Sequence, residues 1–340
     1  MDRQPVASFA EIRQIMREAP GPHLEAASRT AAREAVLTKP AGALARLEEI
    51  ALWLATWQGK HPPTVNHPRV AVFAGNHGVA DLGVSAYPKE VTLQMVLNFQ
   101  SGGAAVNQLC KNADADLRVY EMCLDQPTAD FTQGPALTEE ETARAMAYGM
   151  MAVEPGIDLL CLGEMGIANT TSASAMAAAL YGGSGADWAG PGTGVHGTQL
   201  TRKAEVIDLG LKRHAAVFND GLAIMQCLGG HELAAIAGAV IAARMARVPV
   251  LLDGFACTVA AATLLKLDSR ALDHCLVAHC SAEPGHRKFL EKIGKKPLLD
   301  LGMRLGEASG AALAIPLIRA AAMCHSGMAS FAEAGVSTKE

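Results

Sequence analysis

The segment from residue 163 to 171 has the composition of an anion-binding turn. It reads Gly-Glu-Met-Gly-Ile-Ala-Asn-Thr-Thr, between an apolar run at 157–162 and a run of small residues at 172–180. A strand that ends at glycines and continues as a helix leaves free backbone N–H groups, and the helix dipole favours an anion beside them. A carboxylate is unfavourable there, so we expect Glu164 to have a role of its own. The segment therefore predicts a functional site rather than a plain turn.

Three further positions have residue types that suit a nucleotide site. Residues 190–194 contain three glycines in five residues and could cradle a phosphate or a ring, although they match neither a Walker A motif nor G-x-G-x-x-G. Lys203 follows this loop and is a candidate partner of a phosphate, with a solvated lysine as the alternative. Asp253 ends an apolar run, where a carboxylate is as often a helix cap as a ligand.

Residues 274–286 concentrate histidines and cysteines behind another apolar run. The side chains that suggest a metal site are His274, Cys275, His279, Cys280 and His286. Their spacing is not that of a zinc site, and in a strand they alternate between its two faces. Nothing in the local sequence marks an activated thiolate either. We therefore expect no metal site and no nucleophilic cysteine in this segment.

Glu307 lies among small residues, ahead of an apolar helical run at 313–324. Such surroundings hinder ionisation of a carboxylate, and the raised basicity that results suits a general base. The alternative is a glutamate in the first turn of a helix, where the dipole favours a negative charge.

The elements that position these residues follow from the hydrophobic pattern. Short apolar runs bounded by Gly, Asn or Asp predict buried strands at 69–74, 117–124, 157–162, 248–252 and 275–280. Helical segments lie between them, including 90–110, 138–153 (which opens with a Thr-Glu-Glu-Glu capping box) and 230–247. This alternation predicts a Rossmann-like α/β fold with a mostly parallel sheet flanked by helices. Such sheets bind ligands beyond the carboxyl ends of their strands.

The two ends of the chain have a different pattern. Residues 1–60 and 305–340 show helical periodicity without strand signals. We expect them to form a small helical domain on an α/β core of residues 61–304, with the second segment carrying Glu307. Residues 182–197 form the only long loop, and long ordered loops are often functional.

Composition excludes several classes of protein. Of the 340 residues, 50% are hydrophobic but only 4% aromatic, which fits small-residue packing of helices on a sheet. A net charge of -5 argues against nucleic acid or an anionic membrane as partner. Residues 1–5 show no signal peptide, and the longest apolar stretch, 233–243, is too short to span a bilayer. Eight cysteines without a C-x-x-C pair predict a reduced, cytoplasmic protein.

Taken together, these segments resemble the nicotinate-nucleotide–dimethylbenzimidazole phosphoribosyltransferases, which prepare the lower ligand of cobalamin. The likeness runs in order from about residue 36 to 335, and its blocks are residues 76–79, 88–92, 163–171, 190–194, 252–255, 279–286 and 305–312. One difference is Asn76, where many members have aspartate. An acid role at this position is therefore in doubt, whereas the later blocks are unaffected.

The resemblance implies a two-domain homodimer that needs no metal or cofactor. It also implies that 5,6-dimethylbenzimidazole displaces nicotinate from C1′ of nicotinate mononucleotide, giving α-ribazole 5′-phosphate with inversion. Glu307 would be the base that removes the benzimidazole proton, and Glu164 would face the ribose or the charge at C1′. The implied substrate-binding residues are Pro88, Met165 and Leu305 at the ring, Gly166, Ala168, Asn169, Thr170, Lys203 and Ser281 at the phosphate, and also Gly192, Thr193, Gly194 and Asp253.

Two other functions are compatible with such a site. A nucleosidase or phosphorylase would use water or phosphate as the nucleophile, but an enclosed apolar ring pocket excludes water. A nucleotide sensor would keep the glycine-rich loops and would not need Glu307. The sequence leaves open which base is preferred among benzimidazoles, adenine and phenols, because an apolar pocket discriminates a methyl group by only about 1–3 kcal/mol.

Overall fold

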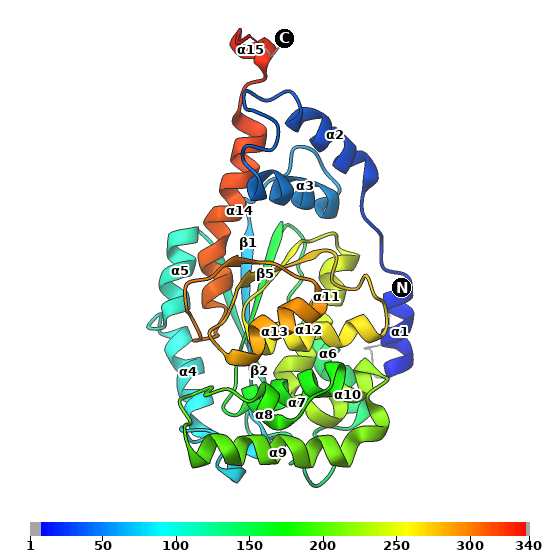
Figure 1. Cartoon of the computed structure of the whole chain (residues 1–340), viewed down its shortest axis with the longest axis vertical. Coiled ribbons are helices and arrows are strands. Elements are labelled where there is room, and N and C mark those ends of the chain that lie inside the picture. Colours follow the sequence, from blue (N-terminus) through cyan, green and yellow to red (C-terminus); the bar gives the residue numbers. More distant parts are fainter. Residues whose placement is uncertain (1–7, 338–340) are drawn as a thin grey trace.

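The computed structural model of the chain describes residues 8–337, built around a six-stranded parallel sheet with helices on both faces (Figure 1). Residues 1–5, for which the sequence analysis expects no signal peptide, lie outside the described residues. Within the described range, no helix is long and apolar enough to cross a membrane.

The strand order is β2-β1-β3-β4-β5-β6. The strands are β1 (Pro68–Gly75), β2 (Asp116–Met122), β3 (Leu159–Met165), β4 (Val250–Leu252), β5 (Cys275–His279) and β6 (Pro297–Leu299). This sheet confirms the Rossmann-like fold class and the apolar runs predicted as strands. The order reverses between β1 and β3, so the chain leaves these two strands in opposite directions across the sheet.

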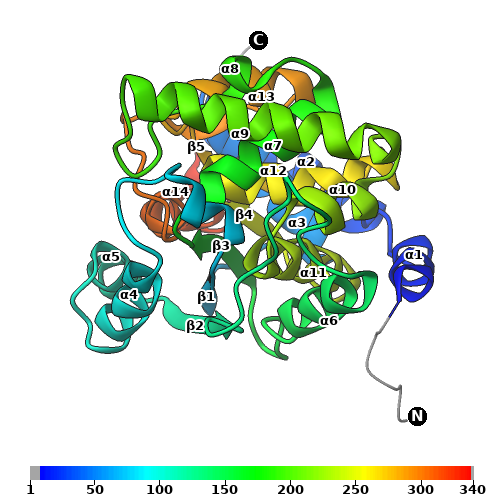
Figure 2. The same cartoon turned by 90° about the horizontal axis from the view of Figure 1, so that it is seen from below.

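The sheet separates two layers of helices, and alternate residues of β1 face them. Ala71 and Phe73 pack in one apolar cluster, Val70 and Val72 in the other. The first layer includes α6 (Glu139–Met150), α7 (Asn169–Tyr181), α10 (Gly221–Leu228), α11 (His231–Met245) and α12 (Phe255–Ala262). The second includes α3 (Arg46–Gln58), α5 (Ala105–Ala113) and α14 (Ser309–Gly327), and Figure 2 shows both layers from below. Because both faces are covered, all of β1 is buried and reads as an apolar run.

The remaining helices lie at the edges of these layers. They are α1 (Phe9–Arg17), α2 (Leu24–Glu34), α4 (Glu90–Gln100), α8 (Gly185–Trp188), α9 (Thr198–His214), α13 (Pro284–Ile293) and α15 (Phe331–Ala334), with short 3-10 turns at 78–82, 215–217 and 263–266. The predicted capping box of α6 is present: Thr138 Oγ1 accepts from the N–H of Glu141, and Glu141 Oε2 accepts from the N–H of Thr138.

Two local predictions were wrong. The segment 90–110 is not one helix, because Gly102 adopts a left-handed φ of 80° and separates α4 from α5. The long loop at 182–197 contains a helical turn, α8, whose start is capped by Asp187 accepting from the N–H of Ser184 at 2.8 Å.

Helices from both ends of the chain meet at one pole of the molecule. Arg33 of α2 donates to the carbonyl groups of His325, Ser326 and Met328 at the end of α14. Leu37 forms an antiparallel bridge with Ser330, and Figure 1 shows α2, α3 and α15 around the upper end of α14. Helix α1 instead packs on α6 of the core. The predicted domain limits at residues 60 and 304 stay a prediction.

Candidate active site

The main cavity, of about 700 Å³, lies at the carboxyl ends of β3, β4 and β5. Two glycines make the approach of the chain segments possible. A Cβ on Gly166 would come within 2.7 Å of the carbonyl oxygen of Gly75, and one on Gly163 within 2.2 Å of the backbone nitrogen of Ala308. Most of the predicted site residues line this cavity: Glu164, Met165, Gly166, Ala168, Asn169, Thr170, Gly192, Thr193, Ser281, Leu305 and Glu307.

The turn before α7 offers fewer free N–H groups than its sequence predicts. Ile167 donates to Thr92 Oγ1, and Asn169 and Thr171 donate to the carbonyl groups of Gly166 and Ala168. No such partner is found within residues 8–337 for the N–H groups of Ala168 and Thr170, which therefore remain available for an anion.

Lys203 of α9 lies behind this turn and does not line the cavity. Its Nζ donates to Thr170 Oγ1 at 2.8 Å and to the carbonyl oxygen of Gly190 at 2.9 Å. Only 1% of the residue is exposed, so the alternative of a solvated lysine is wrong. Burial lowers its pKa to about 8. The ammonium group thus places positive potential beneath the start of α7 and fixes the glycine-rich loop.

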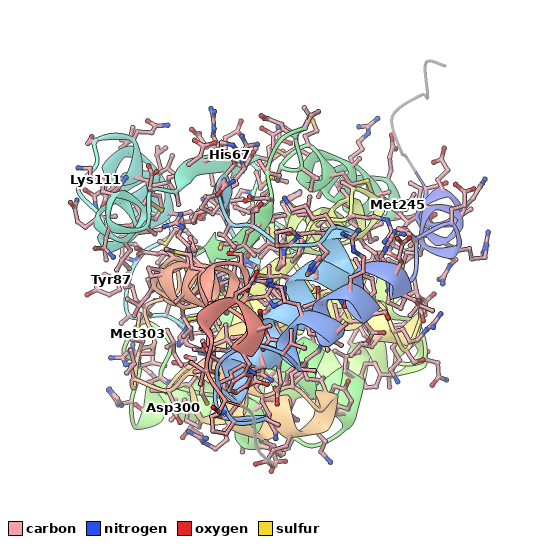
Figure 3. The ribbon with its side chains drawn as sticks, turned by 90° about the horizontal axis from the view of Figure 1, so that it is seen from above. His67, Tyr87, Lys111, Met245, Asp300 and Met303 are labelled. Carbon is pink, nitrogen blue, oxygen red and sulfur yellow. The ribbon has the colours of Figure 1, made fainter. Side chains whose placement is uncertain are left out.

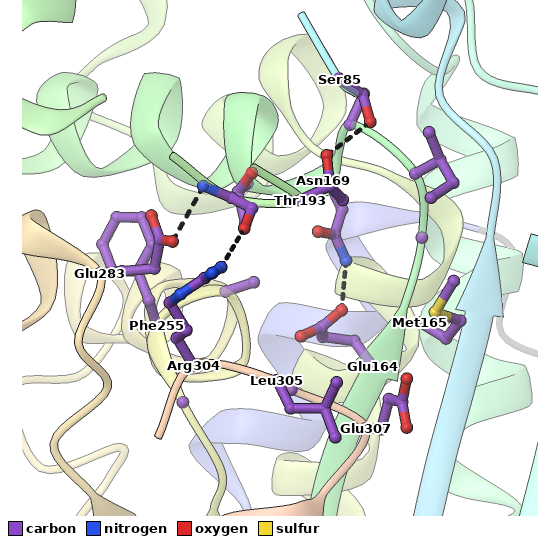
Figure 4. A pocket seen from close by; sticks show the side chains of 18 of the residues that line it. Ser85, Glu164, Met165, Asn169, Thr193, Phe255, Glu283, Arg304, Leu305 and Glu307 are labelled. Carbon is purple, nitrogen blue, oxygen red and sulfur yellow. Dashed lines mark hydrogen bonds between the residues drawn. The ribbon is translucent and has the colours of Figure 1, made fainter. Parts of the chain in front are cut away.

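The loop at 190–194 is held from several sides (Figure 4). Glu283 Oε1 accepts from the N–H of Gly192 at 2.9 Å, and Arg304 Nη1 donates to the carbonyl oxygen of the same residue at 2.9 Å. Thr193 Oγ1 lies 2.8 Å from Ser85 Oγ. Gly194, predicted from the same motif, does not line the cavity.

Two carboxyl groups share the floor of the cavity. Asn169 Nδ2 donates to Glu164 Oε2, and the N–H of Glu307 donates to the main-chain oxygen of Glu164 at 3.1 Å. Burial, together with the nearby charges of Asp253, Glu232 and Glu307, raises the pKa of Glu164 to about 8. The carboxyl group of Glu164 can therefore exchange a proton near neutral pH.

Glu307 precedes α14 and is not part of it. Glu307 and Ala308 adopt left-handed φ angles of 60° and 59°, an uncommon conformation that turns the chain into α14 at Ser309. The residue is 6% exposed, and burial with the charge of Asp253 raises its pKa to about 7. A strained backbone and a carboxyl group of raised pKa at a cavity wall are typical of a functional site.

Asp253 and Pro88 are predicted site residues that do not line the cavity. Asp253 is buried, and its Oδ1 accepts from the N–H of Ala311 at 2.9 Å, so it caps α14 from a different strand. Its Oδ1 also lies 3.6 Å from His279 Nε2. Pro88 stands between Tyr87 and the first residues of α4.

Several cavity residues were not predicted from the sequence. They are Val84, Ser85, Tyr87, Val91, Met95, Ile167, Gly254, Phe255, Ala256, His279, Glu283, Arg304 and Gly306. Many neighbour predicted residues, as Tyr87 neighbours Pro88 and Arg304 neighbours Leu305, and this adjacency was the available signal. Figure 3 shows the molecule from above, where Tyr87 lies on the same side as Met303, the residue before Arg304.

Two histidines on either side of β5, His274 and His286, have structural roles. His274 Nε2 pairs with the carbonyl oxygen of Val240 at 2.9 Å, and His286 Nδ1 accepts from the N–H of Ser281 at 2.8 Å. Burial lowers the pKa of both rings to about 3, so they are neutral. Among residues 8–337, no group of three or more His, Cys, Asp or Glu side chains is arranged to hold a metal ion.

Comparison with known proteins identifies the family. The profile of a phosphoribosyltransferase family matches residues 19–336. A protein of Rhizobium etli (strain CIAT 652) called nicotinate-nucleotide–dimethylbenzimidazole phosphoribosyltransferase is 55% identical over 331 residues, which cover 97% of this chain and 98% of that protein. A protein of the same name from Brucella anthropi is 54% identical over 329 residues, which cover 97% of each chain.

Solved structures give the same result. The crystal structure of this phosphoribosyltransferase from Thermus thermophilus aligns with a TM-score of 0.85 at 42% identity, covering 93% of this chain and 99% of that one. The structure called CobT from the same organism aligns with a TM-score of 0.87 at 43% identity, covering 93% and 100%. Similarity of this extent covers more than nine-tenths of the chain. The chain therefore belongs to the nicotinate-nucleotide–dimethylbenzimidazole phosphoribosyltransferase family.

Proposed function

We propose that the protein transfers the 5-phosphoribosyl group of nicotinate mononucleotide to 5,6-dimethylbenzimidazole and releases nicotinate. The observation that carries this proposal is the position of Glu307. Its carboxyl group has a pKa of about 7 and lines the same cavity as the apolar side chains of Met165 and Leu305. A base beside an apolar wall suits a flat, dimethylated ring that must lose a proton as it reacts.

The chemistry needs a base on one side of C1′ and no acid on the other. Nicotinate leaves from a pyridinium, so it departs with a neutral ring nitrogen. The attacking benzimidazole nitrogen gains positive charge, and the N–H at the other ring nitrogen becomes acidic. Glu307 accepts that proton, and a pKa near the working pH makes it an efficient acceptor.

Glu164 stabilises the positive charge that develops at C1′. With a pKa of about 8 in the free protein, much of it is protonated at neutral pH. The cationic pyridinium of the bound nucleotide favours the carboxylate, because an opposite charge nearby lowers the pKa of an acid. Substrate binding thus creates the negative charge that the transition state requires.

The phosphate lies at the start of α7. The N–H groups of Ala168 and Thr170 face it, and Ser281 adds a hydroxyl group from the end of β5. Lys203 contributes through its contact with Thr170 and through its charge. This arrangement separates the phosphate from Glu307, so the cavity holds the anion and the base at different walls.

In this proposal the protein is a homodimer of this chain and is located in the cytoplasm. The dimer follows from the family resemblance, and light scattering should give about twice the chain mass of 35.4 kDa. A mass of one chain would contradict it. The location is supported by the eight cysteines, none of which forms a disulfide.

The proposed reaction is tested with purified protein, nicotinate mononucleotide and 5,6-dimethylbenzimidazole, with both products separated by chromatography. We expect equal amounts of nicotinate and α-ribazole 5′-phosphate, and loss of both in Glu307→Gln. Glu205→Gln is the matched control, because Glu205 is exposed on α9 and does not line the cavity. Nicotinate without the ribazole product would indicate a nucleosidase, and binding without reaction would indicate a sensor.

A further inference from the structure

The proposed base, Glu307, stands on a backbone that needs support from other parts of the chain. Glu307 and Ala308 both adopt left-handed φ angles, of 60° and 59°. Two such residues in a row persist only where the surrounding structure holds them. Figure 4 shows Glu307 beside Glu164 at the floor of the cavity, and the N–H of Glu307 donates to the main-chain oxygen of Glu164 at 3.1 Å. Strand β3 therefore holds one side of this turn.

Helix α14 begins directly after the turn and has no capping side chain of its own. Its N-cap residue is Ala308, which offers no side-chain acceptor to the free N–H groups of the first turn. Asp253, which follows β4, takes that place, because its Oδ1 accepts from the N–H of Ala311 at 2.9 Å. One carboxylate from a different strand thus holds the other side of the turn.

The main chain of Asp253 is fixed to the strand on which the turn packs. Its N–H donates to the carbonyl oxygen of Leu162 in β3 at 3.0 Å. The next residue of β3, Gly163, lies so close to the turn that a Cβ there would come within 2.2 Å of the nitrogen of Ala308. The strands β3 and β4 and the turn therefore brace one another, and Asp253 joins β4 to α14.

Asp253 has no direct access to the cavity. It is 1% exposed and does not line the cavity, whereas His279 at the end of β5 does. Nε2 of His279 lies 3.6 Å from Oδ1 of Asp253. The ring of His279 packs so closely on α14 that a Cβ on Gly310 would come within 2.0 Å of its Cδ2. Asp253 can therefore act on the reaction only through its neighbours.

The charge of Asp253 also reaches the base. Burial raises the pKa of the Asp253 carboxyl group, and His279 together with backbone N–H groups at the start of α14 opposes this rise. The Asp253 carboxylate adds to the effect of burial in raising the pKa of Glu307 to about 7, because a like charge nearby disfavours ionisation. The other titratable groups near Asp253 are Cys161 and Glu164 of β3 and Cys257 of α12. Burial raises the pKa of both thiols well above the ordinary value, so they stay neutral.

We propose that Asp253 is a positioning residue for the base: its carboxylate holds the start of α14, thereby fixes the turn that carries Glu307, and its negative charge strengthens Glu307 as a proton acceptor. This role rests on the proposed function, in which Glu307 removes the benzimidazole proton. The expected effect on the rate is large, because a displacement of about 1 Å at a reacting group can cost roughly 100-fold.

Two substitutions separate the hydrogen bond from the charge. Asp253→Asn keeps an oxygen that can accept from Ala311, whereas Asp253→Ala removes both the acceptor and the charge. We would measure kcat and KM for both substrates as a function of pH. In Asp253→Ala the plateau of kcat should fall roughly 10- to 100-fold, with little change in KM for nicotinate mononucleotide. In Asp253→Asn most of the plateau should remain, and the rise of kcat should move below the wild-type pH of about 7.

Asp220 supplies the matched control. Its Oδ1 accepts from the N–H of Leu222 at 3.0 Å and caps α10, and the residue does not line the cavity. Asp220→Ala and Asp220→Asn should keep the wild-type kcat and pH profile. In addition, Glu307→Gln/Asp253→Ala should be no slower than Glu307→Gln alone, because no base remains to be positioned.

Urea unfolding supplies a second measurement that does not depend on turnover. The wild type loses stability as the pH rises through the raised pKa of Glu307, so the stability of Glu307→Gln relative to the wild type should be greater at pH 8 than at pH 5. When both proteins also carry Asp253→Asn, this difference between the two pH values should be smaller.

Other results would overturn the proposal. Wild-type kcat in Asp253→Ala would show that the base does not depend on Asp253 for its position, and a further loss in the double variant would show that Asp253 acts elsewhere. A wild-type pH profile in Asp253→Asn would refute the effect of the charge. If Asp253→Ala does not fold, Asp253→Asn and urea unfolding still decide. Absence of transfer by the wild type would contradict the proposed function instead, while urea unfolding would still test the link between Asp253 and Glu307.

Discussion

At the scale of single residues, two glutamates on one cavity floor, for which we propose different tasks, have different environments. Glu307 has a pKa of about 7 and Glu164 a pKa of about 8, and burial is the main cause for both. The difference lies in their partners, because Asn169 donates to Glu164, whereas among residues 8–337 no donor to the carboxyl group of Glu307 is found. A carboxylate that accepts a hydrogen bond from a fixed donor, as Glu164 does, suits charge stabilisation. A carboxylate without such a donor, as in Glu307, suits proton transfer.

Glu307→Gln should lower kcat by a factor on the order of 10² to 10⁴, because the proton of the attacking base loses its acceptor. Binding of nicotinate mononucleotide should remain. The base must be ionised to act, so wild-type kcat should rise with pH and level off above about 7. This rise should vanish in the variant. A wild-type profile that is flat between about pH 5 and 8 would contradict the assignment.

Glu164→Gln should change how stability depends on pH. The folded protein holds the proton of Glu164 up to a pKa of about 8, whereas the ordinary value is 4.5, so the folded state binds more protons between these values. The free energy of unfolding of the wild type therefore falls as pH rises through this window, by up to about 1.4 kcal/mol per pH unit. Urea unfolding at pH 5 and at pH 8 should show that the stability of the variant, relative to that of the wild type, is greater at pH 8 than at pH 5. If the difference in free energy of unfolding between variant and wild type were the same at both pH values, the raised pKa of Glu164 would be refuted.

At the scale of elements, a buried chain of hydrogen bonds ties the start of α7 to the neighbouring elements. His77, directly after β1, pairs through Nε2 with Glu232 of α11 at 2.7 Å and through Nδ1 with Ser172 of α7 at 3.0 Å. The side chains of His77 and Glu232 are fully buried. The segment 76–79, which resembles a family block, thus supports the proposed anion site from behind and does not line the cavity.

His77→Ala should destabilise the protein by about 3–5 kcal/mol, because it leaves the carboxyl group of Glu232 buried without a partner. Ser172→Ala removes only one hydrogen bond and should cost about 1 kcal/mol. Urea unfolding measures both. The double variant His77→Ala/Glu232→Leu should lose less free energy of unfolding than the two single variants lose together. Strictly additive losses would show that His77 and Glu232 are not coupled.

The sequence predicts elements better than contacts between them. Strands β1, β3, β4 and β5 are recognisable because buried parallel strands are largely apolar. The edge strand β2 is mostly exposed or partly buried, and β6 has three partly buried residues and begins with Pro297. The solvated and buried alternatives for Lys203 cannot be separated locally, since its partners Thr170 and Gly190 come from other elements. Likewise Asp253 caps a helix that begins far along the chain, at Ser309.

At the scale of the whole molecule, α14 connects the cavity with the helices at the pole. Its first turn is held by Asp253 and its last turn by Arg33. Nineteen residues in a helix span about 28 Å, so one element joins two distant sites. Packing of α14 on α3 and α5 fixes its direction between these ends.

Arg33→Ala should destabilise the protein by about 1–3 kcal/mol, because three carbonyl groups near the end of α14 lose their donor. Thermal unfolding measures the change. Arg29→Ala, on the same helix, is the control, since within residues 8–337 Arg29 makes no hydrogen bond or ion pair. Equal effects of the two substitutions would show that the carbonyl contacts do not hold the pole together.

The turn formed by residues 306–308 packs directly on Gly163 of β3, so the proposed base, Glu307, is supplied by a late part of the polypeptide. During synthesis the ribosome makes β3 and the start of α7 well before this turn. A nascent chain can thus shape the nucleotide cradle, but it lacks the proton acceptor until the C-terminal segment has emerged and docked. With Glu307 as the proposed base, we expect turnover only from molecules whose translation has passed this point, and unfinished copies should not consume the donor by this route.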